Sequence, residues 1–118
     1  MLLLGFTKQP GWPEPRVWVF IVLIAPLLEE FVFRGELQAW LFEKPKLKQM
    51  PLLRISYANL LTSAIFAAFH AFSQPLVWAA SVMAPSLVFG WARDRTGSVL
   101  PGMVLHAWYN LGFVALFV

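Results

Sequence analysis

Apolar residues fall into four runs along the chain, separated by short polar segments. The runs cover about residues 17–42, 55–72, 76–92 and 99–118. A helix needs roughly 20 mostly apolar residues to cross a ~30 Å hydrocarbon core, and each run approaches that length. The pattern predicts an all-α, polytopic membrane protein with about four transmembrane helices, which form one core over residues 17–118.

Prolines mark the places where these helices are expected to bend or end. Pro26 removes a backbone donor within the first run, which predicts a kink, and Pro85 interrupts the third run. Residues 73–75, Ser-Gln-Pro, form a tight turn between the second and third runs. Residues 1–6 lack the basic region of a signal peptide, and residues 1–16 are expected to be an interfacial segment, unless an upstream helix precedes them.

The composition supports lipid as the solvent of this chain. Of its 118 residues 59% are hydrophobic and 13% are charged, which is too few charges to cover the surface of a soluble domain. The sequence contains no cysteine, which excludes disulfides, thiolate metal ligands and a cysteine nucleophile. Any chemistry must therefore use carboxylate, imidazole, hydroxyl or amide groups.

The net charge of +3 is concentrated in two loops, residues 43–54 and 93–98. Both loops lie on the same side of a four-span chain, and most of the nine Lys and Arg residues belong to them. Basic loops stay in the cytoplasm, so this placement predicts cytoplasmic loops and outward-facing termini. It indicates control of topology and no nucleic acid partner.

Several ionisable or strongly polar residues lie within the apolar runs. Such a residue costs roughly 2.5–3.5 kcal/mol at the bilayer centre, so each one is first interpreted as functional. Glu30 and Arg34 are four residues apart, which predicts an ion pair on one helix face. Glu29 is turned by about 100° from Glu30, so it faces another neighbour and is free to act as a base.

The second and fourth runs contribute imidazole and amide groups. His70 follows Phe66 by four residues, which places an aromatic wall beside the imidazole. His106 and Asn110 have the same spacing, and Gly102 and Gly112 are expected to allow close helix packing there.

Together these groups are the parts needed to hydrolyse an amide. Glu29 can take a proton from water, and His70 can orient that water or share the proton. His106 and Asn110 can donate hydrogen bonds to the developing oxyanion. The alternative is structural: the same polar groups only hold the helices together, as buried polar groups in membrane helices often do.

Three motifs carry a resemblance to a known family. Glu29-Glu30-Phe-Val-Phe-Arg34 resembles E-E-x-x-x-R, Phe66-Ala-Ala-Phe-His70 resembles F-x-x-x-H, and His106-Ala-Trp-Tyr-Asn110 resembles H-x-x-x-N. These are the motifs of the CAAX protease and bacteriocin-processing (Abi, CPBP) intramembrane protease family, and the resemblance covers residues from about 17 to 118. The compact form is similar to bacterial glutamic-type proteases of C-terminal sorting-signal systems.

The resemblance implies that the chain is the core of a CAAX-protease-like helical bundle and a peptide hydrolase. It implies catalytic roles for Glu29 with His70, which activate water, and for His106 with Asn110, which form the oxyanion hole. Glu30, Arg34 and Phe66 support the site. The family has been described both as glutamic proteases and as metalloproteases. We favour the glutamic type with no cofactor, because an amide is a poor zinc ligand; the zinc candidates are otherwise Glu29, His70 and His106.

The resemblance also implies partners and a location. The expected substrate is a membrane-anchored or C-terminally tagged protein, cleaved near its C-terminus at the bacterial inner (plasma) membrane. Family members usually have more spans, so a second copy, a partner membrane protein or the substrate's own helix is expected to replace the missing ones. The third run is expected to supply packing and substrate contacts through Trp78, Met83 and Trp91.

Two other functions fit the same polar residues. The first is a non-catalytic immunity or peptide-binding factor that uses the same polar cavity. The second is a proton or ion pathway, for which four spans leave little room for alternating access.

Overall fold

The first helix runs without a break from Pro15 to Phe42, and two stretches of it are π-helical. In the computed structural model, which describes residues 14–117, its parts are α1 (Pro15–Val19), η2 (Phe20–Ile24), α2 (Ala25–Glu30), η3 (Phe31–Gln38) and α3 (Ala39–Phe42). Pro26 lacks an N–H, and its ring would clash with the carbonyl of Val22 in a regular α-helix. The wider π turns of η2 lie at that carbonyl, which accommodates the proline. The helix therefore continues past Pro26.

The remaining helices are α4 (Tyr57–His70), α5 (Leu76–Ser81), α6 (Met83–Thr96) and α7 (Leu100–Phe117). Ser56 caps α4, because its side chain accepts a hydrogen bond from the backbone N–H of Asn59 at 3.0 Å. Gly97 ends α6 in the left-handed conformation with a φ of 71°, which glycine adopts without strain.

The predicted interruption of the third run is confirmed, and it falls at Val82, between α5 and α6. A proline ring clashes with the carbonyl four residues earlier, which for Pro85 belongs to Ser81. Ser81 is the last residue of α5. The position of the break therefore follows from the proline, which itself lies in the first turn of α6.

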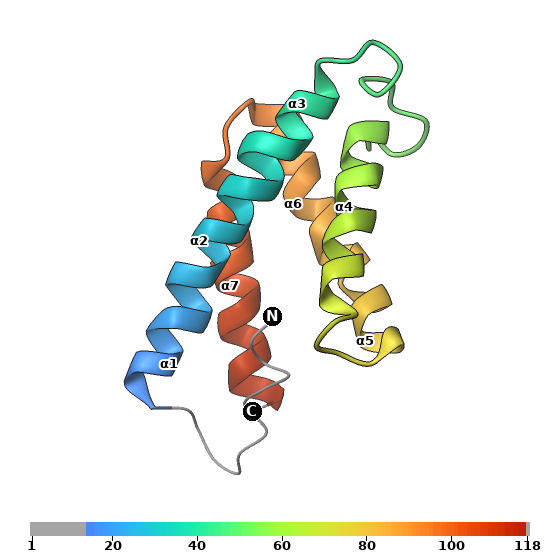
Figure 1. Ribbon diagram of the computed structural model, residues 1–118. Helices are drawn as coiled ribbons and strands as arrows, with labels where there is room; N and C mark the ends of the chain where they lie inside the picture. Colours follow the sequence, from blue (N-terminus) through green and yellow to red (C-terminus); the bar gives the residue numbers. More distant parts are fainter. Residues whose placement is uncertain (1–13, 118) are drawn as a thin grey trace.

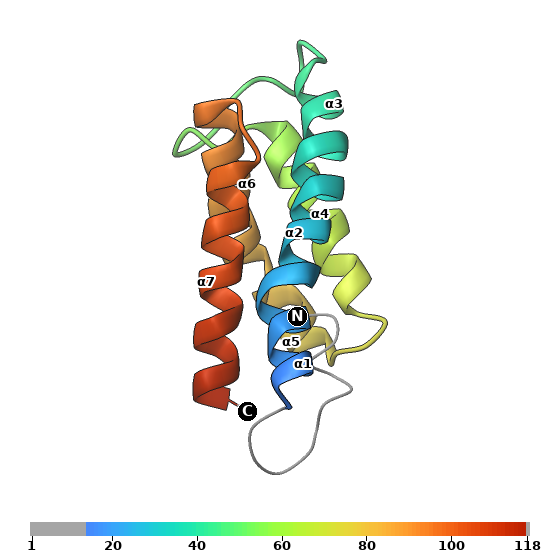
Figure 2. The ribbon, with the colours of Figure 1, turned by 90° about the vertical axis from the view of Figure 1, so that its left-hand side faces the viewer.

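The long helices pack side by side with alternating direction (Figures 1 and 2). α6 contacts both α4 and α7, and α2 contacts α7. The connection between α3 and α4 lies at the same end of the bundle as the turn between α6 and α7, as predicted for the two basic loops (Figure 1). The described residues form no strand beyond one isolated bridge between Leu52 and Ile55, so the all-α prediction is confirmed. Most of the predicted interfacial segment 1–16 lies outside the described residues.

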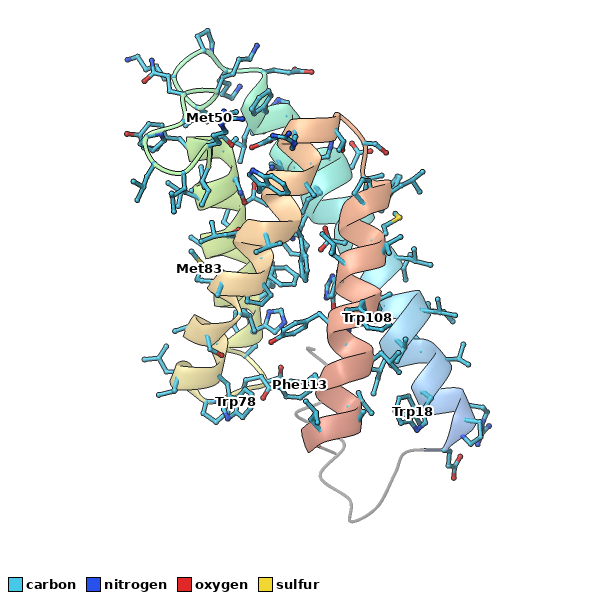
Figure 3. The ribbon with its side chains drawn as sticks, turned by 180° about the vertical axis from the view of Figure 1, so that it is seen from behind. Trp18, Met50, Trp78, Met83, Trp108 and Phe113 are labelled. Atoms are coloured by element: carbon cyan, nitrogen blue, oxygen red, sulfur yellow. The ribbon has the colours of Figure 1, made fainter. Side chains whose placement is uncertain are left out.

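Polar side chains are buried in this bundle as often as apolar ones. Eleven polar or charged residues of the described chain are buried, among them Arg34, Gln38 and Asn59, each with none of its surface exposed. Large apolar side chains cover much of the outside, including Trp108, which is 74% exposed (Figure 3). The apolar core cluster is small and consists of Ile21, Phe66, Ala67, Val82 and Val114.

One helical segment of the described chain, Leu76–Thr96, is long and apolar enough to cross a membrane by length and hydropathy alone. The segment Leu100–Leu116 is apolar but shorter. The first helix is long but carries Glu29, Glu30 and Arg34, which lower its hydropathy. The four predicted spans therefore stay a prediction.

Two glycines bring helices close together, and a third does not. A Cβ atom on Gly90 would lie 1.9 Å from the side-chain oxygen of Asn59, and one on Gly102 would lie 3.2 Å from a carboxylate oxygen of Glu30. A Cβ on Gly112 would have nothing within 4 Å, so the expectation of close packing at Gly112 is wrong.

Gly90→Ala is expected to destabilise the protein, because the added methyl group collides with Asn59 where α4 and α6 meet. Overpacking of this kind typically costs about 1–3 kcal/mol. Denaturation of the purified protein in detergent measures the effect. Gly112→Ala is the matched control: it is expected to leave stability unchanged or slightly raised, because alanine is the better helix former. Equal stabilities of the two variants would contradict the close contact at Gly90.

Candidate active site

Glu30 lies at the centre of a buried charge cluster. Its Oε1 accepts hydrogen bonds from Arg34 Nη1 at 3.3 Å and from His106 Nδ1 at 2.8 Å, and all three side chains are fully buried. The ion pair predicted from the spacing of Glu30 and Arg34 is therefore present. A carboxylate only accepts, so Nδ1 of His106 carries a hydrogen.

The other ring nitrogen of His106 faces Glu29. Nε2 lies 3.5 Å from Glu29 Oε2, a close approach that is longer than a normal N–H···O hydrogen bond. The two carboxylates and Arg34 together carry one net negative charge. The group becomes electrically neutral when His106 carries a second proton, and unbalanced charge is expensive in a low-dielectric interior.

Two phenylalanine rings form walls around these groups. The ring of Phe89 stacks on His106 with centroids 4.8 Å apart, and the ring of Phe66 lies 5.9 Å from His106 and 4.6 Å from His70. The Arg34 guanidinium carbon lies 5.1 Å from the centroid of Phe66 and 5.7 Å from that of Phe89. Phe66 therefore connects the two histidines and the arginine, whereas Phe89 was not predicted from the sequence.

His70 is the last residue of α4 and is fully buried. Its Nδ1 lies 2.8 Å from the carbonyl oxygen of Phe66, so Nδ1 donates and Nε2 keeps a lone pair. The Phe66 ring lies beside His70 as well as beside His106 and Arg34, which places His70 at the edge of the cluster.

Asn110 bonds to the first helix. Its Nδ2 donates to the carbonyl oxygen of Ile21 at 2.9 Å. In the π register of η2, where Ala25 N–H bonds to Phe20 O, the carbonyl of Ile21 would pair with the N–H of residue 26. That residue is a proline and has no N–H, so Asn110 supplies the missing donor. One further N–H of its amide remains for another acceptor.

A ladder of hydrogen bonds continues from Arg34 towards the end of the bundle with the basic loops. Arg34 Nη2 donates to the backbone oxygen of Ser86 at 2.6 Å and also contacts its hydroxyl. That hydroxyl donates to Ser63 at 2.8 Å, and Ser63 donates to Asn59 at 3.1 Å. These contacts were not predicted from the sequence, because the residues are uncharged, although buried hydroxyl and amide groups on apolar helices commonly join helices.

Each of the four predicted catalytic residues has one buried polar atom without a hydrogen-bond partner among the described residues. These atoms are Glu29 Oε2, His70 Nε2, His106 Nε2 and Asn110 Oδ1. The carboxylate oxygen of Glu29 and the Nε2 atoms of the two histidines can bind and orient a water molecule. At Asn110 the group able to donate to a peptide carbonyl is the second hydrogen of Nδ2, since its Oδ1 only accepts.

The zinc candidates Glu29, His70 and His106 do not form a metal site. No three His, Asp or Glu side chains in residues 14–117 are arranged so that they could hold a metal ion. The Nδ1 atoms of both histidines are engaged in protein hydrogen bonds, which leaves Nε2 of each ring available.

Arg34→Met is expected to destabilise the protein by about 3–5 kcal/mol, because it leaves the buried Glu30 carboxylate without its cation. Arg16→Met is the matched control, since Arg16 lies in the same helix and pairs with the N-cap residue Glu14 but is 90% exposed. Its stability is expected to equal that of the wild type in the same denaturant titration. A small effect of Arg34→Met would show that the buried pair is not a main support of the bundle.

Comparison with known proteins places the chain in a family. Searches of the curated proteins and of the solved structures found no match. A family model described as "Type II CAAX prenyl endopeptidase Rce1-like" matches residues 11–112, which is most of the chain and includes every residue from Glu29 to Asn110. The family resemblance of the three motifs is thereby confirmed. The chain belongs to the Rce1-like family of type II CAAX prenyl endopeptidases.

Proposed function

We propose that the protein is an intramembrane endopeptidase that hydrolyses a peptide bond near the C-terminus of a membrane-associated protein. The observation that carries this proposal is that Glu29 Oε2 and His106 Nε2 face each other at 3.5 Å beside the buried pair of Glu30 and Arg34, and that neither atom, nor His70 Nε2, has a hydrogen-bond partner among the described residues. Family membership supports a peptidase.

The membrane location is supported by the distribution of side chains. Charged and amide groups are buried between the helices, and residues such as Leu28, Phe31 and Trp108 are more than half exposed. A surface of this kind is stable against lipid and unfavourable in water. We propose about four spans in the bacterial inner membrane, with the basic loops 43–54 and 93–98 in the cytoplasm.

Glu29 is proposed to act as the base in its ionised form. It takes one proton from water while His70 Nε2 accepts a hydrogen bond from the same water. The water oxygen bonds to the scissile carbonyl carbon, and the carbonyl oxygen becomes an oxyanion. The C–N bond then breaks, the oxyanion closes back to a carbonyl, and the leaving nitrogen takes the proton from Glu29.

His106 and Asn110 are proposed to hold the oxyanion. Nδ1 of His106 is committed to Glu30, so His106 can donate through Nε2 only when it carries a second proton. In that state Glu29 is ionised and the group of Glu29, Glu30, Arg34 and His106 is neutral. One protonation state therefore prepares both the base and the oxyanion donor. Losing one such donor typically lowers kcat by about 10²–10³.

The proposal includes no cofactor and no metal step. The substrate is a membrane-anchored or C-terminally tagged protein, and a second copy or a partner membrane protein is proposed to complete its path to the site. A non-catalytic peptide-binding or immunity factor would use the same residues without needing a base at position 29. Removal of that base therefore separates the two functions.

Glu29→Gln is expected to abolish cleavage, because the amide keeps the size of the side chain but cannot accept a proton from water. Membrane proteins of cells that carry each variant are compared by mass spectrometry of their C-terminal peptides. An uncleaved protein is expected to accumulate with Glu29→Gln. Glu36→Gln, on an exposed position of the same helix, is the matched control and is expected to leave cleavage intact. Normal processing with Glu29→Gln at wild-type protein levels would refute the assigned mechanism.

The proposed topology predicts which positions a membrane-impermeant thiol reagent reaches. The sequence has no cysteine, so a single introduced cysteine is the only target. In intact spheroplasts, Phe72→Cys, at an 86% exposed position after α4, is expected to react. Lys46→Cys, in the first basic loop, is expected to react only after permeabilisation. The reverse pattern would invert the orientation, and equal labelling of both would contradict a spanning bundle.

A further inference from the structure

A cavity lies at the end of the bundle with the basic loops. Its volume is about 340 Å³, and it is lined by Met50, Arg54, Trp91, Asp94 and Arg95. Two of these residues come from the connection between α3 and α4, where Figure 3 shows Met50, and three come from α6. We call it the Arg54/Arg95 cavity.

The cavity is separate from the candidate active site. On α6, Phe89 faces His106, with which it stacks. At about 100° per residue, Trp91 and Arg95 project roughly 200–240° around the helix from Phe89. The two sites therefore use opposite faces of α6.

The charge around the Arg54/Arg95 cavity favours an anion. In the described part of the chain, Arg54 and Arg95 form no ion pair with a carboxylate, and the Arg95 guanidinium carbon lies 5.5 Å from the centroid of Trp91. Both carboxylate oxygens of Asp94 already accept hydrogen bonds within the protein, from Gln38 and Ser56. With two guanidinium groups and one carboxylate, the lining carries one net positive charge beside mostly apolar walls.

The backbone at Arg54 has an unusual conformation at the point where the chain borders the cavity. Leu53 and Arg54 have φ values of 54° and 59°, in the left-handed region that residues other than glycine seldom adopt. Backbone strain of this kind concentrates at functional sites. In this protein the two strained residues lie in the turn that places Arg54 at the cavity.

An apolar strip on the outside of α6 leads to the same cavity. Ala84, Val88, Trp91 and Arg95 are spaced so that they share one helix face, and all four are exposed. The strip begins with small and apolar residues and ends at the cationic cavity. An amphiphile with an anionic head and an apolar tail matches that order.

We propose that the Arg54/Arg95 cavity binds the phosphate of an anionic glycerophospholipid. Arg54 and Arg95 contact the phosphate, because guanidinium groups match its geometry and charge. The glycerol and the start of an acyl chain lie against Met50 and Trp91, and the chain follows the strip along α6. This binding is independent of the proposed proteolysis.

Native mass spectrometry of the full chain in detergent, with phosphatidylglycerol or phosphatidylcholine added in turn, tests the proposal. The wild type is expected to retain phosphatidylglycerol about tenfold more than phosphatidylcholine. The double variant Arg54→Gln, Arg95→Gln is expected to lose that preference. The matched control Lys44→Gln, Lys46→Gln removes two charges from exposed positions of the same basic loop and is expected to keep it.

Three results would overturn the proposal. The first is an equal loss of preference in both double variants, which would indicate general charge attraction. The second is the absence of any preference in the wild type. The third is displacement of phosphatidylglycerol by an equal concentration of glycerol 3-phosphate, which would make this a site for soluble phosphates. Circular dichroism spectra that match the wild type establish that both double variants are folded.

Discussion

The contact of Glu30 with Arg34 and His106 fixes how three helices sit against each other. Glu30 belongs to α2, its partner His106 comes from α7, and Arg34 reaches Ser86 on α6. A buried charge that loses its partner is strongly destabilising, whereas apolar contacts tolerate small shifts. The helices cannot slide relative to one another without exposing one of these charges to an apolar environment. The hydrogen bond from His106 Nδ1 to Glu30 also fixes the orientation of the imidazole ring, so that Nε2 faces Glu29.

Pro26 imposes a second constraint, which connects the backbone to the candidate site. The proline leaves the carbonyl of Ile21 without its usual donor, and Asn110 from α7 supplies one. The bond places Asn110 beside the first helix, on the same helix as His106 and one turn beyond it. Asn110 therefore has a structural bond through one amide hydrogen, and the other hydrogen is available for the proposed oxyanion contact. A substitution at Asn110 would therefore remove both the bond to the Ile21 carbonyl and the proposed oxyanion contact.

The sequence predicts local features of this protein well and long-range contacts poorly. The pair of Glu30 and Arg34 and the proximity of Phe66 to His70 follow from a spacing of four residues within one helix. The contact of Glu30 with His106 joins residues that are 76 positions apart, and only the packing of α2 on α7 produces it. The motif pattern had placed these residues at one site without indicating which atoms meet.

The buried uncharged residues were harder to recognise for a different reason. Asn59, Ser63 and Ser86 lie within apolar runs, but a serine or asparagine changes the hydropathy of a run less than a glutamate does. Asn59 and Ser63 are four residues apart, which is the same signal that revealed Glu30 and Arg34. That spacing, applied to amides and hydroxyls as well as to charges, would have identified the face of α4 that meets α6.

The inner face of α6 belongs to the candidate active site, and its outer face belongs to the proposed lipid site. Its inner face presents Ser86, Phe89 and Gly90, which hold Arg34, stack on His106 and bond to Gln38 through the Gly90 carbonyl. Its outer face presents Val88, Trp91 and Arg95. Gln38 connects the two faces, because its amide donates both to the Gly90 carbonyl and to Asp94, which lines the cavity. A shift of the whole helix would move the support of Arg34 and the floor of the Arg54/Arg95 cavity together. Occupation of the cavity would then stabilise the same helix position that the buried charge cluster requires.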